Sequence, residues 1–403
     1  MSQCPLRYPS QEGAEHPFPF YAWARAEQPV YQIPGLPYYF LTKYEDLVYA
    51  TEHPEIFSSV GRNLGTTVEA QPKTASGIEI RTMIESDAPD HPTHRSFAFQ
   101  LLNPKALREY RPMILELVEQ LIDSFIDQGE VEFVSAFANK LPALVTARMA
   151  GFPDSLLTDL HAWGQIEGSG APFLPPEKYA EHLRVRDSMV DYVRSAIEAR
   201  AVDPPDDGIG KLIKLQVERD GEFSLPYVRA QAGVLLAGGT TTTAHMLGMG
   251  LLLLINHPDV MRRVVDDKTL IRPFLDEALR VESPVQWVPR RVARDVELGG
   301  VKIPAGSHIL LGWGSANRDE TVFENPDAFD IDREGPNKHV SFGHGPHACL
   351  GLPLARLELT IAFERLLTRL TDIRLALGAE PRHIDSPSFR GLRSLPITFK
   401  RAP

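Results

Sequence analysis

The ten residues FGHGPHACLG, 342–351, constrain this chain more than any other part of its sequence. They place Cys349 between a glycine-rich turn and a helix that we expect to begin near Leu350. The free N–H groups and the partial positive charge of a helix N-terminus favour the thiolate form of a cysteine. Glycines also let the backbone approach a flat ligand closely, because they carry no side chain. The pattern therefore indicates a thiolate that holds one face of a planar, metal-bearing ligand.

Two other interpretations of Cys349 are open. A single cysteine inside a fold is commonly just a small apolar side chain. Zinc is the second alternative, because His344 and His347 lie close to Cys349 in sequence and His91 and His94 lie upstream. Structural zinc sites usually use four ligands in closely spaced pairs, whereas the second cysteine of this chain is near its N-terminus.

The composition is that of one large globular unit. Of 403 residues, 43% are hydrophobic and 24% are charged, and no linker, repeat or low-complexity tract divides them, so we expect a single domain over 1–403. A formal net charge of −11 argues against nucleic-acid binding. No apolar run approaches the roughly 18 residues that span a bilayer, and the first residues lack the features of a signal peptide. We therefore expect a cytoplasmic monomer without a membrane segment.

Helical periodicity dominates the chain, and short β-rich segments lie between the helices. We expect a mainly α fold with small β-sheets. The expected helices cover about 17–28, 43–53, 104–127, 186–200, 228–256, 269–282 and 351–370. The expected strands lie within 36–41, 296–313 and 395–400, with a hairpin turn at Gly299-Gly300. Residues 60–85 and 164–177 are predicted loops, which is where recognition residues tend to lie.

FGHGPHACLG matches the Phe-Gly-x-Gly-x-His-x-Cys-x-Gly signature of the cytochrome P450 family at every fixed position. The chain resembles soluble bacterial members of that family over nearly its whole length. The resemblance implies the P450 fold, haem b with Cys349 as its axial thiolate, and cofactor contacts from Phe342 and Gly351. It also implies monooxygenase activity, because a thiolate ligand pushes electron density onto iron and favours O–O cleavage.

The same resemblance assigns a structural network. Glu277 and Arg280, in the stretch EALR, lie three residues apart on one helix face, where they can pair. Taken alone, such a pair is common on solvated helices. In the family it forms part of a Glu-Arg-Arg network behind the haem, whose third member falls here on Arg333 in the stretch FDIDRE.

The two haem propionates need cations and hydrogen-bond donors. The stretch DAPDHPTHR matches the family's His-x-x-x-Arg pattern and gives His91 and Arg95. The segment VPRRVARDVELGG places the propionate arginine on Arg290, with its neighbour Arg291 as the alternative, and His347 is the remaining partner. Without the resemblance, each of these residues would be interpreted as a surface charge.

A run of weak helix formers interrupts an apolar helix at LLAGGTTTTAHM, 235–246. The family places such a helix across the oxygen-binding face of haem, with the pattern Ala/Gly-Gly-x-acid-Thr at the crossing. Ala237 and Gly238 match the small pair, which puts Thr240 at the acid position and Thr241 at the alcohol position. A local widening of the helix frees a backbone carbonyl oxygen from its helical hydrogen bond. A threonine hydroxyl can donate to that carbonyl and bind a water molecule at the same time. A run of four threonines does not itself fix which hydroxyl faces the iron.

Thr240 departs from the family, which usually has Asp or Glu at this position. A hydroxyl can pass a proton along a water chain, but it cannot store one at neutral pH. One interpretation is an ordinary monooxygenase in which waters and another group relay protons. The other is altered oxygen activation, such as peroxide use or oxidative coupling. A non-enzymatic haem sensor is the alternative from a different class.

The resemblance also implies pocket residues by segment, namely Gly233, Leu236, Gln286, Trp287 and Phe389. It places Ala237 beside the haem, and it offers Phe173 and the 60–85 loop as further candidates for the pocket. Such a lining fits a compact apolar or aromatic substrate, and the ending FRGLRSLPITF resembles members that oxidise small methoxy-aromatics. Neither a dinucleotide-binding Gly-x-Gly-x-x-Gly motif nor a ferredoxin-like cysteine cluster occurs, so electrons are expected from a separate ferredoxin or flavodoxin. Its docking face is expected to include Lys105, Arg108, Arg111 and Arg356.

Overall fold

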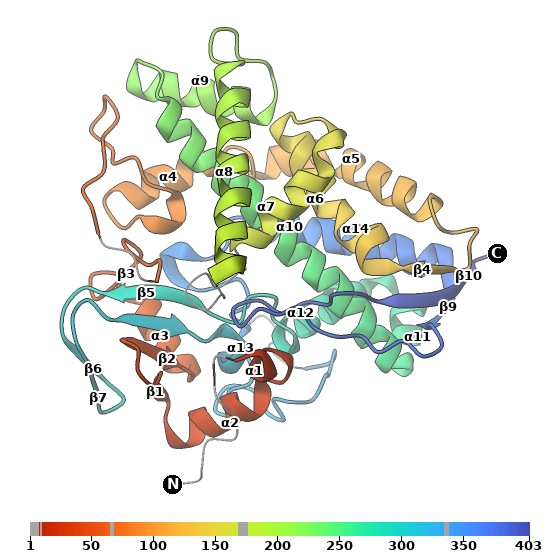
Figure 1. The fold of residues 1–403 in the computed structure, drawn as a ribbon. Coiled ribbons are helices and arrows are strands. Elements are labelled where there is room, and N and C mark those ends of the chain that lie inside the picture. The colour runs from red at the N-terminus through yellow and green to blue at the C-terminus, as the bar shows by residue number, and fades with distance from the viewer. Residues whose placement is uncertain (1–7, 9, 65–67, 168–175, 334–337) are drawn as a thin grey trace.

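The computed structural model of the protein describes residues 8, 10–64, 68–167, 176–333 and 338–403 (Figure 1). Phe173 and most of the predicted 164–177 loop lie outside these ranges. The predicted architecture, mainly helical with small sheets, is confirmed. No helix among the described residues combines the length and the apolar character that a membrane span requires.

The α-helices are α1 (Gln11–Glu15), α2 (Phe18–Glu27), α3 (Tyr44–Glu52), α4 (Asp90–Phe99), α5 (Pro104–Asp123), α6 (Lys140–Ala150), α7 (Leu157–Glu167), α8 (Pro176–Glu198), α9 (Gly208–Asp220), α10 (Leu225–Asn256), α11 (Pro258–Asp266), α12 (Ile271–Val281), α13 (Trp313–Ala316) and α14 (Leu352–Arg369). Each helix expected from periodicity is present, most of them within a few residues of the predicted ends. Helices α1, α4, α6, α7, α9, α11 and α13 were not among the helices expected from periodicity.

The strands are β1 (Val30–Gln32), β2 (Tyr38–Leu41), β3 (Phe57–Ser58), β4 (Glu130–Glu132), β5 (Val288–Val292), β6 (Val296–Leu298), β7 (Val301–Ile303), β8 (His308–Leu311), β9 (Leu370–Leu375) and β10 (Pro396–Arg401). The main sheet has the order β1-β2-β8-β5-β3, with β2 and β8 parallel and the other pairs antiparallel. Strands β4, β10 and β9 form a second sheet. The predicted hairpin is β6–β7, and its turn glycines Gly299 and Gly300 have φ of 55° and 77°, as a two-residue type I′ turn requires.

Helix α10 runs through the middle of the helical part of the molecule (Figure 1). It packs against α6, α7 and α8 and also against α12 and α14. A helix that is apolar on all sides is stable only when neighbours cover it, and α10 has a mostly apolar sequence from Val234 to Ile255. The main sheet lies to one side of the helical part, beside the N-terminal helices α1 and α2 (Figure 1). The threonine run is therefore held near the centre of the fold.

The structure brings together the three residues of the predicted network. The side chains of Glu277 and Arg280 are both fully buried on α12, and Arg280 donates two hydrogen bonds to Glu277, of 2.7 and 2.8 Å. Arg333 donates from Nε to Glu277 Oε1 at 3.1 Å. Arg280 also donates to the carbonyl oxygens of Asn317, Pro326 and Ala328. One buried carboxylate thus joins α12 to the segment that leads to the cysteine loop.

Replacing Glu277 with glutamine leaves two guanidinium groups without their buried counter-charge. Because breaking a buried ion pair on one side is expensive, we expect Glu277→Gln to lower the free energy of unfolding by about 3–5 kcal/mol. Urea denaturation followed by far-UV circular dichroism measures this change. The control Asp187→Asn, at an exposed pair with Arg186, should shift it by under about 0.5 kcal/mol. Equal values for Glu277→Gln and the control would show that carbonyl oxygens alone hold Arg280.

Candidate functional site

The cysteine loop has the geometry that its glycines predict. Gly343 and Gly345 have φ of 72° and 70°, a region that glycine enters without cost. A Cβ on Gly345 would lie only 2.9 Å from the carbonyl oxygen of Thr51, so this close approach also requires glycine. The loop closes through a 2.7 Å hydrogen bond from Cys349 N to Phe342 O. Cys349 therefore sits three residues before α14 begins.

Opposing effects act on the pKa of the Cys349 thiol. Burial raises the pKa of the Cys349 thiol, and the backbone N–H groups of Gly351 and Leu352 oppose this by favouring the thiolate. Arg95 of α4 also lowers the pKa through its charge. The residue is nevertheless exposed, and the groove behind the loop is lined by Ala348 and Leu352 but not by Cys349. The thiol is therefore accessible to a ligand and does not open into that groove.

Arginine and histidine side chains from separate segments gather around this part of the fold. The His91 ring on α4 lies over that of His347, with centroids 4.0 Å apart and planes at 35°. Arg290 on β5 is buried, and burial together with the charge of Arg62 lowers its pKa to about 9. The charges of Arg290 and Arg62 also lower the pKa of His347, after burial as the larger cause. The predicted residues His91, Arg290 and His347 thus meet in one cluster, and Arg62 was missed.

The cluster fits a ligand with two carboxylates, as haem has. Asp87 is the carboxylate that acts on Arg290 and His347, and it is already bound to Ser58 and Ser59. A net excess of buried positive charge is costly unless an anion neutralises it. Nε2 of His91 is buried and has no hydrogen-bond partner among the described residues, so it is also suited to a bound anion. The donors present therefore match the haem propionates.

The alternation of β5 favours Arg290 over its neighbour. Arg290 is 5% exposed, whereas Arg291 is half-buried and packs beside Gly61. Successive side chains on a strand point to opposite faces, so the two arginines do not serve the same site. Arg290 is the one that interacts with Arg62, Asp87 and His347.

One stripe of α10 remains open although the helix is surrounded. Gly238 is exposed and Thr242 is half-buried, whereas Thr240, Thr241 and Thr243 are buried. Residues four apart share a helix face, so Gly238 and Thr242 border the same space. Thr242 Oγ1 donates to the Gly238 carbonyl at 3.3 Å, and Thr240 Oγ1 donates to Ala237 O at 3.3 Å. Thr241 Oγ1 is buried and has no hydrogen-bond partner among the described residues, so both Thr241 and Thr242 are candidates for the hydroxyl that faces a ligand.

The difference is a shift of one residue along the helix. Gly238-Gly239 fits the small pair as well as Ala237-Gly238, and it moves the acid position to Thr241 and the alcohol position to Thr242. Ala237 is buried at 4%, in keeping with this shift. The second small pair in the sequence therefore also allows Thr242 at the alcohol position. In either register the acid position holds a threonine.

The pocket residues expected from sequence are only partly brought together. Phe389 is half-buried and forms a β-bridge with Val285, and Gly233 is half-buried with open space where a Cβ would lie. Three expectations need correction, because Leu236 lies in the hydrophobic core and Gln286 and Trp287 are 3% exposed.

Gln286 and Trp287 are bound elsewhere in the fold. The Gln286 amide accepts a hydrogen bond from Tyr21 and donates one to the Ser283 carbonyl. Trp287 belongs to the N-terminal core cluster that includes Tyr8 and Phe20. The half-buried positions of this segment are instead Val285, Val288 and Pro289.

The zinc alternative has no support in the described part of the chain. No group of three or more His, Cys, Asp or Glu side chains is placed there to hold a metal ion. His344 is bonded to Thr51 and lies near Glu52, whereas His347 is bonded to Ser59. The two histidines thus interact with different residues instead of sharing an ion.

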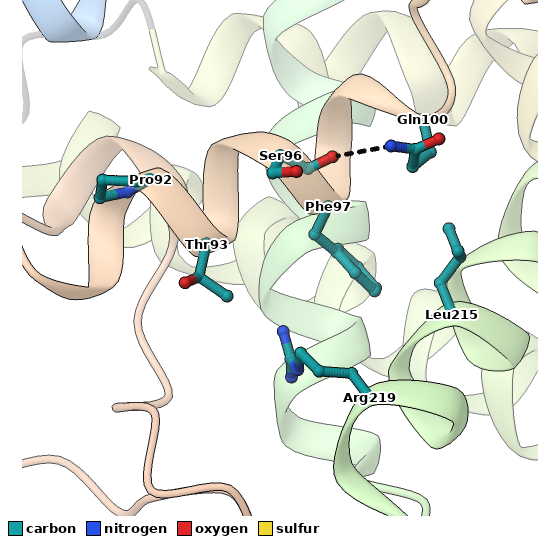
Figure 2. A pocket seen from close by; sticks show the side chains of 7 residues that line it. All are labelled: Pro92, Thr93, Ser96, Phe97, Gln100, Leu215 and Arg219. Atoms are coloured by element: carbon teal, nitrogen blue, oxygen red, sulfur yellow. Dashed lines mark hydrogen bonds between the residues drawn. The ribbon is translucent and has the colours of Figure 1, made fainter.

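A separate groove lies between α4 and α9 (Figure 2). It is lined by Pro92, Thr93, Ser96, Phe97, Gln100, Leu215 and Arg219. Arg219 crosses it beside Phe97 and is paired with Asp220 at 2.6 Å. Neither Cys349 nor any member of the cationic cluster lines this groove, so it is not part of the candidate site.

Comparison with known proteins agrees with this geometry. The family model described as "Cytochrome P450" matches residues 171–389. "Biotin biosynthesis cytochrome P450" of Bacillus subtilis is 33% identical over 398 residues, which cover 97% of this chain and 98% of the relative. CYP109E1 from Bacillus megaterium, solved in complex with testosterone, has a TM-score of 0.87 and 29% identity over 96% of this chain and 99% of its own. P450BioI, solved with a fatty-acid-ligated acyl carrier protein, has a TM-score of 0.86 and 30% identity over 96% and 100%.

Acid should destabilise this protein through its buried histidines. Burial lowers the pKa of His94, which is fully buried on α4, to about 4, whereas an unfolded histidine titrates near 6.5. Between these values the unfolded chain binds a proton that the folded chain does not, so stability falls as the pH falls from about 6.5 to 4. In His94→Gln the slope of unfolding free energy against pH should decrease by up to about 1.4 kcal/mol per pH unit. Urea unfolding between pH 7 and 4.5 measures it, with the exposed His16→Gln as a control. If His94→Gln left this slope unchanged, the lowered pKa of His94 would not be the cause of the acid destabilisation.

Proposed function

The chain belongs to the cytochrome P450 family, and on that premise we propose that it oxidises an apolar organic molecule with electrons from a separate ferredoxin or flavodoxin. It has the P450 fold, it is a monooxygenase, and its cofactor is haem b with a cysteine thiolate ligand. When bound, haem supplies the iron at which O2 is activated, and the overall reaction is RH + O2 + 2 e⁻ + 2 H⁺ → ROH + H2O. We propose in addition a single domain, a monomer and a cytoplasmic location.

The observation that carries the assignment of residues is the cysteine loop beside a surplus of cations. In this proposal Cys349 is the axial ligand, and the loop from Phe342 to Gly351 keeps its side chain accessible. The carboxylates of the cofactor are bound by His91, Arg95, Arg290 and His347, and Arg62 joins them. Glu277, Arg280 and Arg333 have a structural role, because they are held in the network behind the loop.

Thr242 is proposed as the hydroxyl that handles protons on the oxygen side. Its placement on the open stripe, one turn after Gly238, supports this role, and Thr241, whose buried hydroxyl has no hydrogen-bond partner among the described residues, is the alternative. The hydroxyl can accept and donate at once, so it can hold a water and pass a proton along it. Helix α10 carries neither Asp nor Glu, so no carboxylate of this helix can store the proton. This observation favours peroxide-driven or otherwise altered oxygen activation as the second candidate function.

The proposed substrate is apolar. The half-buried residues of the segments that border the site include Val234 and Leu235 on α10 together with Val285 and Phe389. Such a lining binds by burial of apolar area and offers little hydrogen-bond selectivity. Similar structures contain testosterone and a fatty acid linked to an acyl carrier protein. A small methoxy-aromatic, as the C-terminal sequence indicates, is one of the classes to be tested, with hydroxylation or O-demethylation as the outcome.

The proposed electron donor docks behind the cysteine loop. A groove there is lined by Arg272, Lys338, His344 and Arg356, which would attract an acidic partner. Both arginines pair with Asp276, Arg272 at 3.3 Å and Arg356 at 2.7 Å, but the Arg272 side chain is 61% exposed and that of Arg356 only 23%. Lys105, Arg108 and Arg111 on α5 are exposed, as expected. Arg272 therefore replaces Arg356 as the more accessible cation of the proposed surface.

Substitution of Thr242 tests the proton path. Thr242→Ala removes the hydroxyl on the open stripe, so product formed per O2 consumed should fall by about tenfold or more. Thr241→Ala, the matched control, should change this ratio by less than about twofold. Product and O2 consumption are measured with a plant-type ferredoxin, its reductase and the first substrate found below, and then with hydrogen peroxide alone. A larger effect from Thr241→Ala would return the role to Thr241, and full activity with peroxide alone would favour the second candidate function.

Visible absorption spectra test the substrate class. The haem-loaded protein is titrated with methoxybenzoates, phenols, terpenes, steroids and fatty acids, the last both free and linked to an acyl carrier protein. A ligand that displaces water from the iron shifts the Soret band to shorter wavelength, so binding is seen without a redox partner. We expect a saturable shift with one apolar class. A protein purified without haem would contradict the proposed function, and shifts with polar compounds alone would contradict the proposed substrate.

A further inference from the structure

Asp87 connects three segments that border the cationic cluster. Its side chain accepts hydrogen bonds from Ser58 Oγ at 2.5 Å and from Ser59 N at 3.1 Å, at the end of β3. Its backbone oxygen accepts from His91 N at 2.9 Å, at the start of α4. Its Oδ1 lies 3.8 Å from Nε2 of His347 in the cysteine loop. One carboxylate is thus shared by β3, α4 and the cysteine loop, which adjoin in the fold (Figure 1).

The imidazole of His347 is fixed at one edge and on one face. Nε2 lies 3.1 Å from Ser59 Oγ as well as near Asp87, and the ring of His91 covers one face. In the described part of the chain, Nδ1 of His347 makes no hydrogen bond. A histidine held by one ring nitrogen presents the other in a defined direction, as metal-binding histidines do with their supporting carboxylates. The free nitrogen of His347 is therefore oriented before any ligand arrives.

Asp87 is suited to this role by its charge. Burial would raise the pKa of Asp87, but the nearby imidazole of His347 and the hydrogen bonds from Ser58 and Ser59 outweigh it and hold the pKa below its usual value. The carboxylate is therefore ionised at neutral pH. It also attracts Arg290, which the charge of Arg62 repels. Asp87 thus keeps the cationic residues together until two carboxylates of a ligand join them.

We propose that Asp87 is a positioning residue for the haem, which together with Ser59 holds His347 so that Nδ1 is directed at a haem carboxylate. The inference rests on the proposed function, because it requires that haem binds at this cluster. It differs from a role in folding alone, since a carboxylate that merely tied β3 to α4 would affect stability and leave the bound haem unchanged.

The test compares two neighbouring carboxylates. Asp87→Asn removes the charge and keeps the size, and the matched control Asp90→Asn removes a charge on α4 that contacts Glu79 N and not His347. For Asp87→Asn we expect haem to transfer to apomyoglobin about tenfold faster, because supporting groups commonly contribute that factor or more. The reduction potential should become more positive, because a negative charge near the haem is lost. Asp90→Asn should change the rate of haem transfer by less than about twofold.

A double mutant separates positioning from other effects. If Asp87 acts through His347, then in the His347→Ala background Asp87→Asn should speed haem transfer by less than about twofold. Haem transfer and potential at wild-type values in Asp87→Asn, or an undiminished effect in the His347→Ala background, would overturn the inference. If Asp87→Asn does not fold, Ser59→Ala provides the same test with an expected acceleration of about threefold. A wild-type protein without haem would refute the proposed function, whereas haem loss unaffected by these substitutions would refute this inference alone.

Discussion

The buried carboxylate of Glu277 is the interaction on which the rest of the structure depends. It lies on α12, carries two hydrogen bonds from Arg280 and one from Arg333, and accepts another from Asp330 N at 3.0 Å. Ser341 Oγ donates to the Leu279 carbonyl at 2.7 Å and so ties the beginning of the cysteine loop to the same helix. A charge removed from water must be compensated within the protein. The loop therefore has a fixed starting point, and its glycines determine the remaining path to Cys349.

Around that fixed loop, the site is defined by charge that the protein itself does not balance. Arg62, Arg95 and Arg290 come from three different segments, and the rings of His91 and His347 lie against each other in the same cluster. Asp87 offsets part of this charge and holds one of the histidines. A ligand with two carboxylates completes the balance, which explains why so many cations are held in a partly buried region. The thiolate on one side and the carboxylate contacts on another together orient a planar cofactor.

Oxygen-side chemistry depends on which threonine faces that cofactor. Neighbouring helices bury most of the side chains along α10, and the open stripe at Gly238 and Thr242 remains where a ligand can approach. The weak helix formers of this segment are thus tolerated because packing against neighbouring helices, and not intrinsic propensity, stabilises α10. Because α10 carries neither Asp nor Glu, the proposed function assigns proton delivery to hydroxyls and water.

The sequence by itself determined the features that depend on local spacing. FGHGPHACLG fixes the turn and the helix start, EALR fixes a pair three residues apart, and Gly299-Gly300 fixes a two-residue turn, because each is set by backbone geometry over a few residues. Tertiary structure decided the rest. Which of four threonines is open, that Gln286 and Trp287 point into the core, and that Arg62 and Asp87 join the site all depend on neighbours far away in the chain. Helical and strand periods define faces, but only packing decides which face borders a cavity.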